Sequence, residues 1–375
     1  MKYTSPFYSF IPANQRKISK LVIVLLISFF SVCICNVQTD SSVANEDDMD
    51  AYLLVYFKDN THSLYFALST DGYTFTDVNN GKPVVCGDTI ASQKGIRDPH
   101  IARGPDGAFY LAMTDLNIFG QQMGYRTTKW ERDPEKYDWG NNRGFVLMKS
   151  FDLIHWTHND FLFDKAFPEL KEIGCAWAPE TIYDPVAGKM MIYFTMRIRH
   201  GLTKLYYSYT DDDFTKLITF PHILFEYPDP EIQILDADIT HLPDGRYCMM
   251  YVAQENPGGV KMAFSDSINK GYVYNPIWVD LEPGACEAPN VWKRIGENKW
   301  VLMYDIFSIK PNNFGFCETS DFIVFKDIGH FNEGVMKTIN FSSPKHGTVI
   351  QLTKKETEKL TEHWGLSIKF QTHFK

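Results

Sequence analysis

The sequence predicts an all-β protein that folds as a five-bladed β-propeller. Most of residues 50–330 consists of short runs rich in β-branched and aromatic residues, and turn signals separate these runs. One phrase opens the strand units, and a second phrase, with Ser and Asp before an aromatic residue, closes them at intervals of roughly 50 to 80 residues. Matching openings and endings within one period are typical of propeller blades, and a β-sandwich with similar turns is the alternative fold.

The size and composition fit one large folded domain. The chain has 375 residues, of which 44% are hydrophobic and 22% are charged, and this composition argues against disorder. Its formal net charge is −9 and it contains no long run of Lys or Arg, so nucleic acid is not an expected partner. No linker-like stretch interrupts residues 50–350, so the strands are expected to form a single domain.

Residues 1–36 predict a signal peptide. A basic cluster precedes an unbroken run of apolar and small residues at 21–35, which suits a signal-peptide core and is short for a membrane span. An uncleaved membrane anchor is one alternative, and lipid attachment at Cys33 or Cys35 is another. We therefore expect a secreted or periplasmic protein. Lipid attachment would instead anchor it at the cell surface. The remaining cysteines are odd in number and widely spaced, which indicates neither a zinc site nor a dense disulfide framework.

The opening phrase places an acidic residue at the head of three units. It reads Asp98-Pro99-His100-Ile101, then Asp236-Ala237-Asp238-Ile239, then Glu287-Ala288-Pro289-Asn290-Val291. Two further units are expected to begin at Trp177 and His346, without a carboxylate in that place. Inner strands of a propeller line its central channel, so the residues that open these strands are expected to meet at one mouth.

The two ends of the strand region predict how the ring closes. The strand at 346–350 has no following strands of its own, and residues 51–78 contain strands without an inner start. We expect these N-terminal strands to complete the blade begun by 346–350, which removes the open seam of the ring. The propeller is thus predicted over residues 50–352. A helical pattern at 354–364 predicts that residues 353–375 form a helical tail packed on the propeller.

Three carboxylates at one mouth indicate glycoside hydrolysis. That reaction needs one carboxyl group that gives a proton to the leaving oxygen and another that activates a water molecule. A third carboxylate nearby keeps the acid protonated through like-charge repulsion.

The motifs RDPHI, WAPE, LDADI and EAPNVWK, in this order and spacing, resemble those of glycoside hydrolase family 43 over residues 50–352. The resemblance implies a five-bladed propeller and an inverting mechanism with a single displacement. It also implies that Asp98 is the general base, Asp236 the residue that tunes and orients the acid, and Glu287 the general acid. Asp238 stays open as the tuning residue, because it faces the same side of the strand and an alanine stands where the family usually has proline.

Three more residues are expected to contact the substrate. Trp177 is a candidate platform for the apolar face of a sugar ring, with a role in the core as its alternative. Glu180 stands where the family usually has an aspartate, and is interpreted as structural or substrate-side. His346 matches a late His-Gly motif of the family near the channel centre, where it contacts water or a cation; a hydrogen-bonded core histidine is the alternative. Trp130 and Trp139, in a long polar insertion, are expected to border the entrance.

The family resemblance implies a secreted α-L-arabinofuranosidase that trims side chains of plant polysaccharides. β-Xylosidase and galactofuranosidase are alternatives within the family, and a non-catalytic carbohydrate-binding propeller is the alternative from another class. The expected partner is an arabinose- or xylose-containing polysaccharide or oligosaccharide, and the protein is expected to be a monomer. No cofactor is expected to be required and no metal ligand is assigned, although the resemblance allows a structural calcium ion in the central channel.

Overall fold

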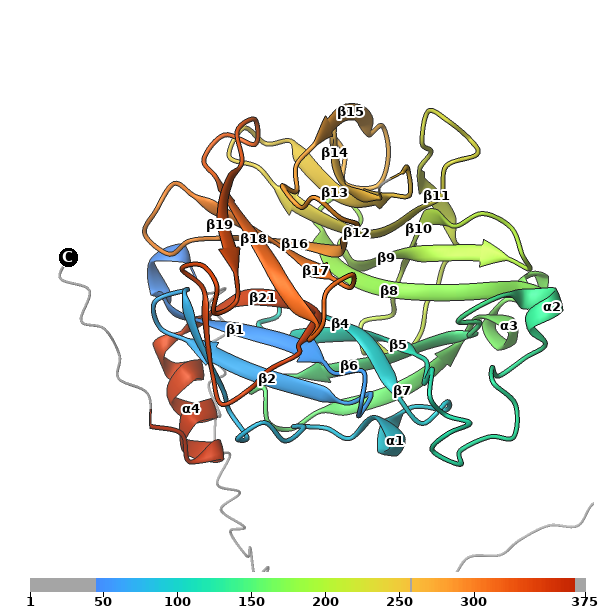
Figure 1. The fold of residues 1–375 in the computed structure, drawn as a ribbon, viewed down its shortest axis with the longest axis horizontal. Coiled ribbons are helices and arrows are strands. Elements are labelled where there is room, and N and C mark those ends of the chain that lie inside the picture. Colours follow the sequence, from blue (N-terminus) through green and yellow to red (C-terminus); the bar gives the residue numbers. More distant parts are fainter. Residues whose placement is uncertain (1–44, 257, 368–375) are drawn as a thin grey trace, which may run out of the picture. The chain divides into compact units, whose positions relative to one another are not determined.

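The computed structural model describes residues 45–256 and 258–367, and in this part of the chain the strands form five sheets. The sheets are arranged as the blades of the predicted five-bladed β-propeller, with helix α4 at one side (Figure 1). The predicted leader over residues 1–36 lies outside the described residues. Within the described residues, no helix is long and apolar enough to cross a membrane.

Each blade runs outward from an inner strand as an antiparallel meander. From the inside, the first blade has β21 (Lys345–Thr353), β1 (Met49–Phe57), β2 (Leu64–Ser69), β3 (Thr74–Asp77) and β20 (Lys337–Ile339). The second has β4 (Ile96–Arg103), β5 (Phe109–Asp115), β6 (Gly144–Ser150) and β7 (Thr157–Leu162), and the third has β8 (Ile173–Asp184), β9 (Lys189–Ile198), β10 (Lys204–Tyr209) and β11 (His222–Phe225). The fourth has β12 (Ile234–His241), β13 (Tyr247–Ala253), β14 (Gly259–Ser265) and β15 (Val273–Trp278), and the fifth has β16 (Glu287–Lys293), β17 (Trp300–Ile306), β18 (Asn313–Thr319) and β19 (Lys326–His330). The helices are η1 (Glu46–Asp48), α1 (Gly87–Ile90), α2 (Pro134–Tyr137), α3 (Phe163–Ala166), η2 (Pro168–Leu170) and α4 (Lys354–Trp364).

The ring closes inside the first blade, as the sequence predicts. Strand β1 pairs antiparallel with β21, with Leu54 opposite Val349, and β1 pairs with β2 on its other side. The N-terminal strands therefore complete the blade that β21 begins. The short strand β20 adds a parallel edge next to β3, with Thr338 opposite Phe75. The sequence analysis did not predict this edge, because three residues carry too little pattern to indicate a strand.

Apolar clusters between neighbouring blades hold the ring together. The described residues form five such clusters, and one cluster lies between each pair of adjacent sheets. Phe145 of the second blade and Phe194 of the third are one buried contact of this kind, with ring centroids 5.2 Å apart. Because each cluster combines side chains from two sheets, the clusters fix the angle between blades and so position the inner strands.

The recurring Ser-Asp endings serve as turns at the outer part of the blades. The Oδ1 atom of Asp71 accepts hydrogen bonds from the backbone N–H groups of the second and third residues that follow, both at 2.7 Å. Asp152 and Asp321 do the same in their own blades. These acids are therefore structural Asx turns, which explains why they recur without contributing to the site.

The five inner strands share a bulge where each unit opens. The pairing register skips one or two residues there. The first skipped residue has a positive φ in every strand: Asp98 (51°), Ala178 (44°), Asp236 (49°), Ala288 (57°) and His346 (24°). The expectation that all three acids occupy one equivalent position is therefore wrong for Glu287. Asp98 and Asp236 are the first skipped residue of their bulges, whereas Glu287 lies just before the bulge of its strand. Arg97 and Trp177 occupy the same place as Glu287 in their own strands. Because a bulge re-aims the side chains beside it, two successive residues of one strand can reach the channel mouth.

Helix α4 occupies the range that the sequence predicts and packs on the first two blades. Thr353 caps its start by accepting from the N–H of Glu356, and Gly365 ends it in the left-handed conformation. Leu360 is fully buried in the cluster between these blades. Glu356 also pairs with Arg103 of β4, with Nη2 and Oε2 2.8 Å apart. Residues 368–375 of the predicted tail lie outside the described residues.

Replacing Leu360 by alanine is expected to lower the free energy of unfolding by about 2–5 kcal/mol, because the buried side chain leaves a cavity between α4 and the sheets. The matched control is Lys359→Ala, an exposed neighbour on the same helix, with an expected change within about 0.5 kcal/mol. Urea unfolding followed by tryptophan fluorescence measures both. Equal midpoints for the two variants would show that α4 does not stabilise the propeller.

Candidate active site

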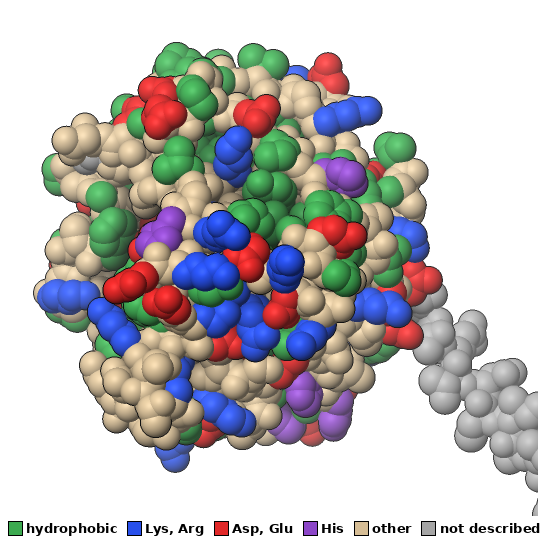
Figure 2. All heavy atoms as spheres, turned by 90° about the vertical axis from the view of Figure 1, so that its right-hand side faces the viewer, with side chains coloured by type: hydrophobic (Ala, Val, Ile, Leu, Met, Phe, Trp, Pro, Cys, Tyr) green, Lys and Arg blue, Asp and Glu red, His purple; other side chains and the backbone are tan. Residues whose placement is uncertain are grey.

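Most of the predicted site residues line one cavity of about 260 Å³. Asp98, Asp236, Glu287, Trp177 and His346 all contribute to its wall. The cavity lies at the end of the propeller where the inner strands begin, on the side of α2. Figure 2 looks onto this side, where acidic and basic side chains lie intermingled around the centre of the face. Opposite charges of this density around a cavity indicate a site that binds a polar ligand or moves protons.

Asp98 is held as a carboxylate at the bulge of β4. Its Oδ2 atom accepts a hydrogen bond from the hydroxyl of Thr114 at 2.7 Å, and its Oδ1 atom lies 3.2 Å from Nδ1 of His346. Burial raises the pKa of Asp98, but His346 and then Arg97 and Thr114 lower it more, so the pKa stays well below its usual range. A buried carboxylate that stays ionised can accept a proton from water.

His346 is the cation that pairs with Asp98. Its backbone N–H donates to Oδ2 of Asp305 at 3.2 Å, which fixes the bulge of β21. Burial lowers the pKa of His346, but Asp98 and then Asp236 and Glu287 raise it to about 9. The surrounding carboxylates therefore favour the imidazolium form, in which both ring nitrogens carry a proton.

The substitution His346→Gln is expected to destabilise the protein by about 3 kcal/mol at pH 6, because it leaves Asp98 buried without its partner. The folded-state pKa of about 9 is above the unfolded value of 6.5. The contribution of His346 is therefore complete below pH 6.5 and is lost as the pH rises through 9. Urea unfolding at pH 6 and pH 9.5 measures this difference.

The control for that experiment is His155→Gln. His155 also pairs with an aspartate, with Nδ1 2.8 Å from Oδ2 of Asp152, but 85% of its side chain is exposed. An exposed pair of this kind contributes about 0–1 kcal/mol. A loss of stability in His346→Gln that is no larger than in the control, or that stays the same at pH 9.5, would contradict the buried pair.

Asp236 lies directly beside the strand segment that carries Glu287. Its Oδ2 atom accepts from the backbone N–H of Ala288 at 3.2 Å, and its own N–H donates to the hydroxyl of Thr195 at 3.0 Å. Burial raises the pKa of Asp236, the charge of His346 lowers it, and Glu287 and Asp98 raise it, so that it lies above its usual range. Asp238 does not line the cavity; its Oδ2 accepts from the N–H of Val291 at 2.6 Å. Of the two aspartates, Asp236 is thus the one placed next to Glu287.

Glu287 has a lysine beside it that the sequence analysis missed. The Nζ atom of Lys345 lies 3.5 Å from Oε1 of Glu287 and 3.5 Å from Oδ2 of the fully buried Asp305. Lys345 precedes the bulge residue His346, just as Glu287 precedes Ala288. The amino group of Lys345 therefore lies between the carboxyl groups of Glu287 and Asp305 and pairs with both.

The aromatic residues form one wall of the cavity. Trp177 is half-buried, and its indole N–H donates to the carbonyl of Gly140 at 2.9 Å. Trp139 is 49% exposed, lines the same cavity and meets Trp177 edge to face, with ring centroids 5.6 Å apart. Trp130 was expected to border the entrance as well. It is instead buried against Trp139 and does not line the cavity.

Glu180 lies beneath the cavity rather than in its wall. It is buried, and its Oε2 atom accepts from the hydroxyl of Tyr193 at 2.9 Å. Of the two roles expected for Glu180, a structural role and contact with the substrate, this position favours the structural role. Burial, and then the charge of Asp238, raise the pKa of Glu180 well above its usual value. The equivalent residue of the second blade is His100, whose Nε2 atom lies 3.7 Å from Oε2 of Glu180 and 3.9 Å from Oδ1 of Asp238.

His100, Glu180 and Asp238 are close enough to share a metal ion, but they do not fit the calcium ion that the resemblance allows. Calcium takes six to eight oxygen ligands, and this group offers two carboxylates that already accept protein hydrogen bonds. Nδ1 of His100 accepts from the N–H of Thr181 at 3.1 Å, so the neutral ring has its proton on Nε2. The nitrogen that faces the carboxylates is therefore a donor and has no lone pair for a metal.

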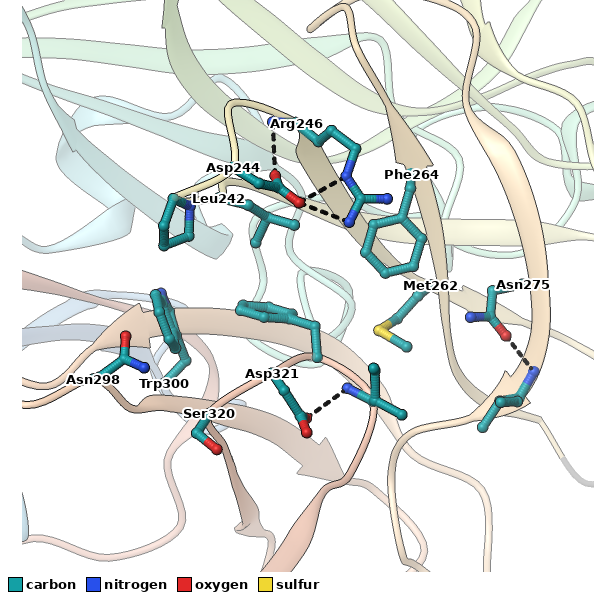
Figure 3. A pocket seen from close by; sticks show the side chains of 14 residues that line it. Leu242, Asp244, Arg246, Met262, Phe264, Asn275, Asn298, Trp300, Ser320 and Asp321 are labelled. Atoms are coloured by element: carbon teal, nitrogen blue, oxygen red, sulfur yellow. Dashed lines mark hydrogen bonds and ion pairs between the residues drawn. The ribbon is translucent and has the colours of Figure 1, made fainter.

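A second, open cavity of about 510 Å³ lies between the fourth and fifth blades. Its floor is apolar, with Met262, Phe264 and Trp300, and Arg246 pairs with Asp244 at its rim (Figure 3). Strand β12 begins at the first cavity and ends just before this one. The second cavity is therefore at the opposite end of the blade, and it contains none of the predicted site residues.

Comparison with known proteins agrees with this site. A family described as "Probable glycosyl hydrolase domain", related to glycoside hydrolase family 43, matches residues 47–358. An α-L-arabinofuranosidase from Bifidobacterium longum subsp. longum is 26% identical over 130 residues, which is 34% of this chain but only 11% of that protein. The aligned stretch therefore spans about a tenth of the length of this relative.

Solved structures share the fold at low sequence identity. The endo-arabinase from Bacteroides thetaiotaomicron has a TM-score of 0.50 at 14% identity, covering 74% of this chain and 94% of that one. The xylan β-1,4-xylosidase from Bacillus halodurans has a TM-score of 0.52 at 12% identity, covering 78% and 54%. Because the matching region of the family includes every strand of the propeller and all three site carboxylates, the chain belongs to the glycosyl hydrolases related to family 43.

Proposed function

We propose that this protein is an exported, inverting α-L-arabinofuranosidase that removes arabinose from side chains of plant polysaccharides. The observation that supports this most strongly is the charge pattern of the first cavity. It combines Asp98, held ionised by His346, with Glu287 and a second aspartate, Asp236, beside the acid. The partial match to an α-L-arabinofuranosidase favours arabinofuranose as the sugar.

In this mechanism the two carboxyl groups act on opposite sides of the bond that breaks. Asp98 takes a proton from a water molecule, whose oxygen attacks the anomeric carbon, and Glu287 gives its proton to the departing glycosidic oxygen. The bond between the anomeric carbon and that oxygen breaks, and the sugar leaves with inverted configuration. Asp236 keeps Glu287 in place through the backbone of β16, and Trp177 offers an indole face for the sugar ring.

Release of 4-nitrophenol from three substrates tests the sugar. We expect 4-nitrophenyl α-L-arabinofuranoside to be hydrolysed with a higher kcat/KM than the β-D-xylopyranoside and the β-D-galactofuranoside. A higher kcat/KM for either of the other two would overturn arabinofuranose and assign the corresponding activity of the same family. Binding of arabino-oligosaccharides with no release from any substrate would favour a carbohydrate-binding propeller over an enzyme.

A further inference from the structure

Arg197 is a buried cation in the cavity wall with no acidic partner. It lies near the end of β9, is 4% exposed and lines the first cavity. Its Nη2 atom donates to the backbone carbonyls of Tyr137 and Trp139 in the insertion. Among the described residues, no carboxylate oxygen lies within 4.0 Å of its guanidinium group, although the exposed Asp138 lines the same cavity.

The other N–H groups of this guanidinium lack partners in the described part of the chain. Nε is buried and makes no hydrogen bond, and none is found for Nη1. A buried charge without a counter-ion costs several kcal/mol unless a ligand or the surroundings compensate it. Arg97, the second arginine in the cavity wall, differs in this respect, because its Nη1 atom lies 2.8 Å from Oδ1 of Asp59.

The guanidinium plane is fixed by aromatic packing. Its Cζ atom lies over the ring of Trp177, 4.7 Å from the centroid, and Trp139 meets the same tryptophan edge to face. Trp177 and the two carbonyl contacts hold the arginine in one orientation. Nη2 is engaged by the two carbonyls and Nε is buried, so Nη1 is the nitrogen left to donate to a ligand. A charged N–H donor binds a carboxylate oxygen more strongly than it binds a neutral hydroxyl.

The cations of the cavity wall differ in whether an acid pairs with them. His346 pairs with Asp98, and Arg97 pairs with Asp59. Arg197 is the cation of the lining for which the described residues supply no such acid. The polar groups of Thr203, Gln233 and Gln254, which belong to the same lining, are suited to the hydroxyls of a sugar.

We propose that Arg197 forms a subsite for the carboxylate of a uronic acid residue, bound against Trp177 next to the glycosidic bond that is cleaved. This proposal rests on the proposed glycosidase function and narrows its substrates to polysaccharide branches that carry an acidic sugar. The carboxylate accepts from Nη1, which has no hydrogen-bond partner among the described residues. The acidic sugar thereby supplies the counter-ion that the folded chain lacks.

Isothermal titration with methyl β-D-glucuronide and methyl β-D-glucoside tests the subsite. We expect the wild type to bind the glucuronide at least about tenfold more tightly, because a charge-assisted contact is lost in the neutral sugar. Arg197→Gln is expected to abolish this preference. The matched control Arg199→Gln removes an exposed arginine that pairs with Glu172 at the end of the same strand, and it should keep the preference.

Arg197→Lys keeps the positive charge without the planar guanidinium that packs on Trp177, and is expected to retain only part of the preference for the glucuronide. It also keeps the test informative if Arg197→Gln does not fold. Equal binding of the two sugars by the wild type, or an unchanged preference in Arg197→Gln, would overturn the subsite. Hydrolysis of neutral arabinofuranosides without a glucuronide preference would refute the subsite alone, and glucuronide binding without hydrolysis of any glycoside would refute the enzyme alone.

Discussion

Replacing Asp98 by asparagine is expected to lower kcat for 4-nitrophenyl α-L-arabinofuranoside by about 10³-fold with little change in KM. Asparagine keeps the size of the side chain and can still accept the hydrogen bond from Thr114, so substrate binding should persist. It cannot take a proton from water, and loss of a general base typically costs 10²- to 10⁴-fold in rate. Steady-state kinetics at several pH values measures both constants.

The matched control is Asp106→Asn in the turn that follows β4. It makes the same chemical change at the far end of the same strand, where Asp106 pairs with Lys149 at 3.0 Å. We expect this variant to keep kcat within about twofold of the wild type, because the ion pair is partly exposed and remote from the cavity. A kcat of Asp98→Asn that is equally close to the wild type would remove Asp98 from the chemistry.

The second large effect is expected for Glu287→Gln, and its size should depend on the leaving group. Hydrolysis of arabino-oligosaccharides, whose leaving oxygen needs a proton, is expected to fall by about 10³- to 10⁴-fold. Hydrolysis of the 4-nitrophenyl glycoside should fall much less, because 4-nitrophenolate departs without protonation. Comparing kcat/KM for the two substrates gives the ratio that distinguishes a general acid from a residue that only positions the sugar.

The control for this comparison is Glu297→Gln. Glu297 lies in the turn after β16, at the other end of the strand that Glu287 opens, and pairs with Arg294 at 2.9 Å. Both substrates should be hydrolysed at nearly the wild-type rate by this variant. An equal loss on both substrates in Glu287→Gln would show that Glu287 does not protonate the leaving group.

The fold was predictable because its signals are local. The opening phrases, the Ser-Asp turns and the helical pattern at 354–364 each lie within a short stretch of sequence, and each has one physical cause. The closure by β1 was predictable because the last inner strand has no strands after it, and the N-terminal strands have no inner strand before them. The offset of Glu287 was missed because the phrases were compared by their acids. Pro99, Pro179 and Pro289 lie at the same place in their bulges. Alignment on these prolines puts Glu287 level with Arg97 and Trp177.

The charged partners of the site were missed for a related reason. Asp59 is 38 residues from Arg97, and Asp305 is distant in sequence from Lys345, so no motif connects them. Arg197 follows an ordinary apolar strand, and only the fold places it beside Trp177. The acids were found because the family motif contains them, whereas the cations that pair with them are brought there by contacts between blades.

The central claim is that Asp98 and Glu287 hydrolyse a furanoside in a single displacement. Proton NMR during hydrolysis of 4-nitrophenyl α-L-arabinofuranoside tests this most directly, because it identifies the anomer before mutarotation mixes the two forms. The account predicts that β-arabinofuranose appears first and that the α anomer follows only as the sugar equilibrates. Initial release of the α anomer would contradict it, because retention of configuration requires a covalent intermediate and a nucleophile in place of a base.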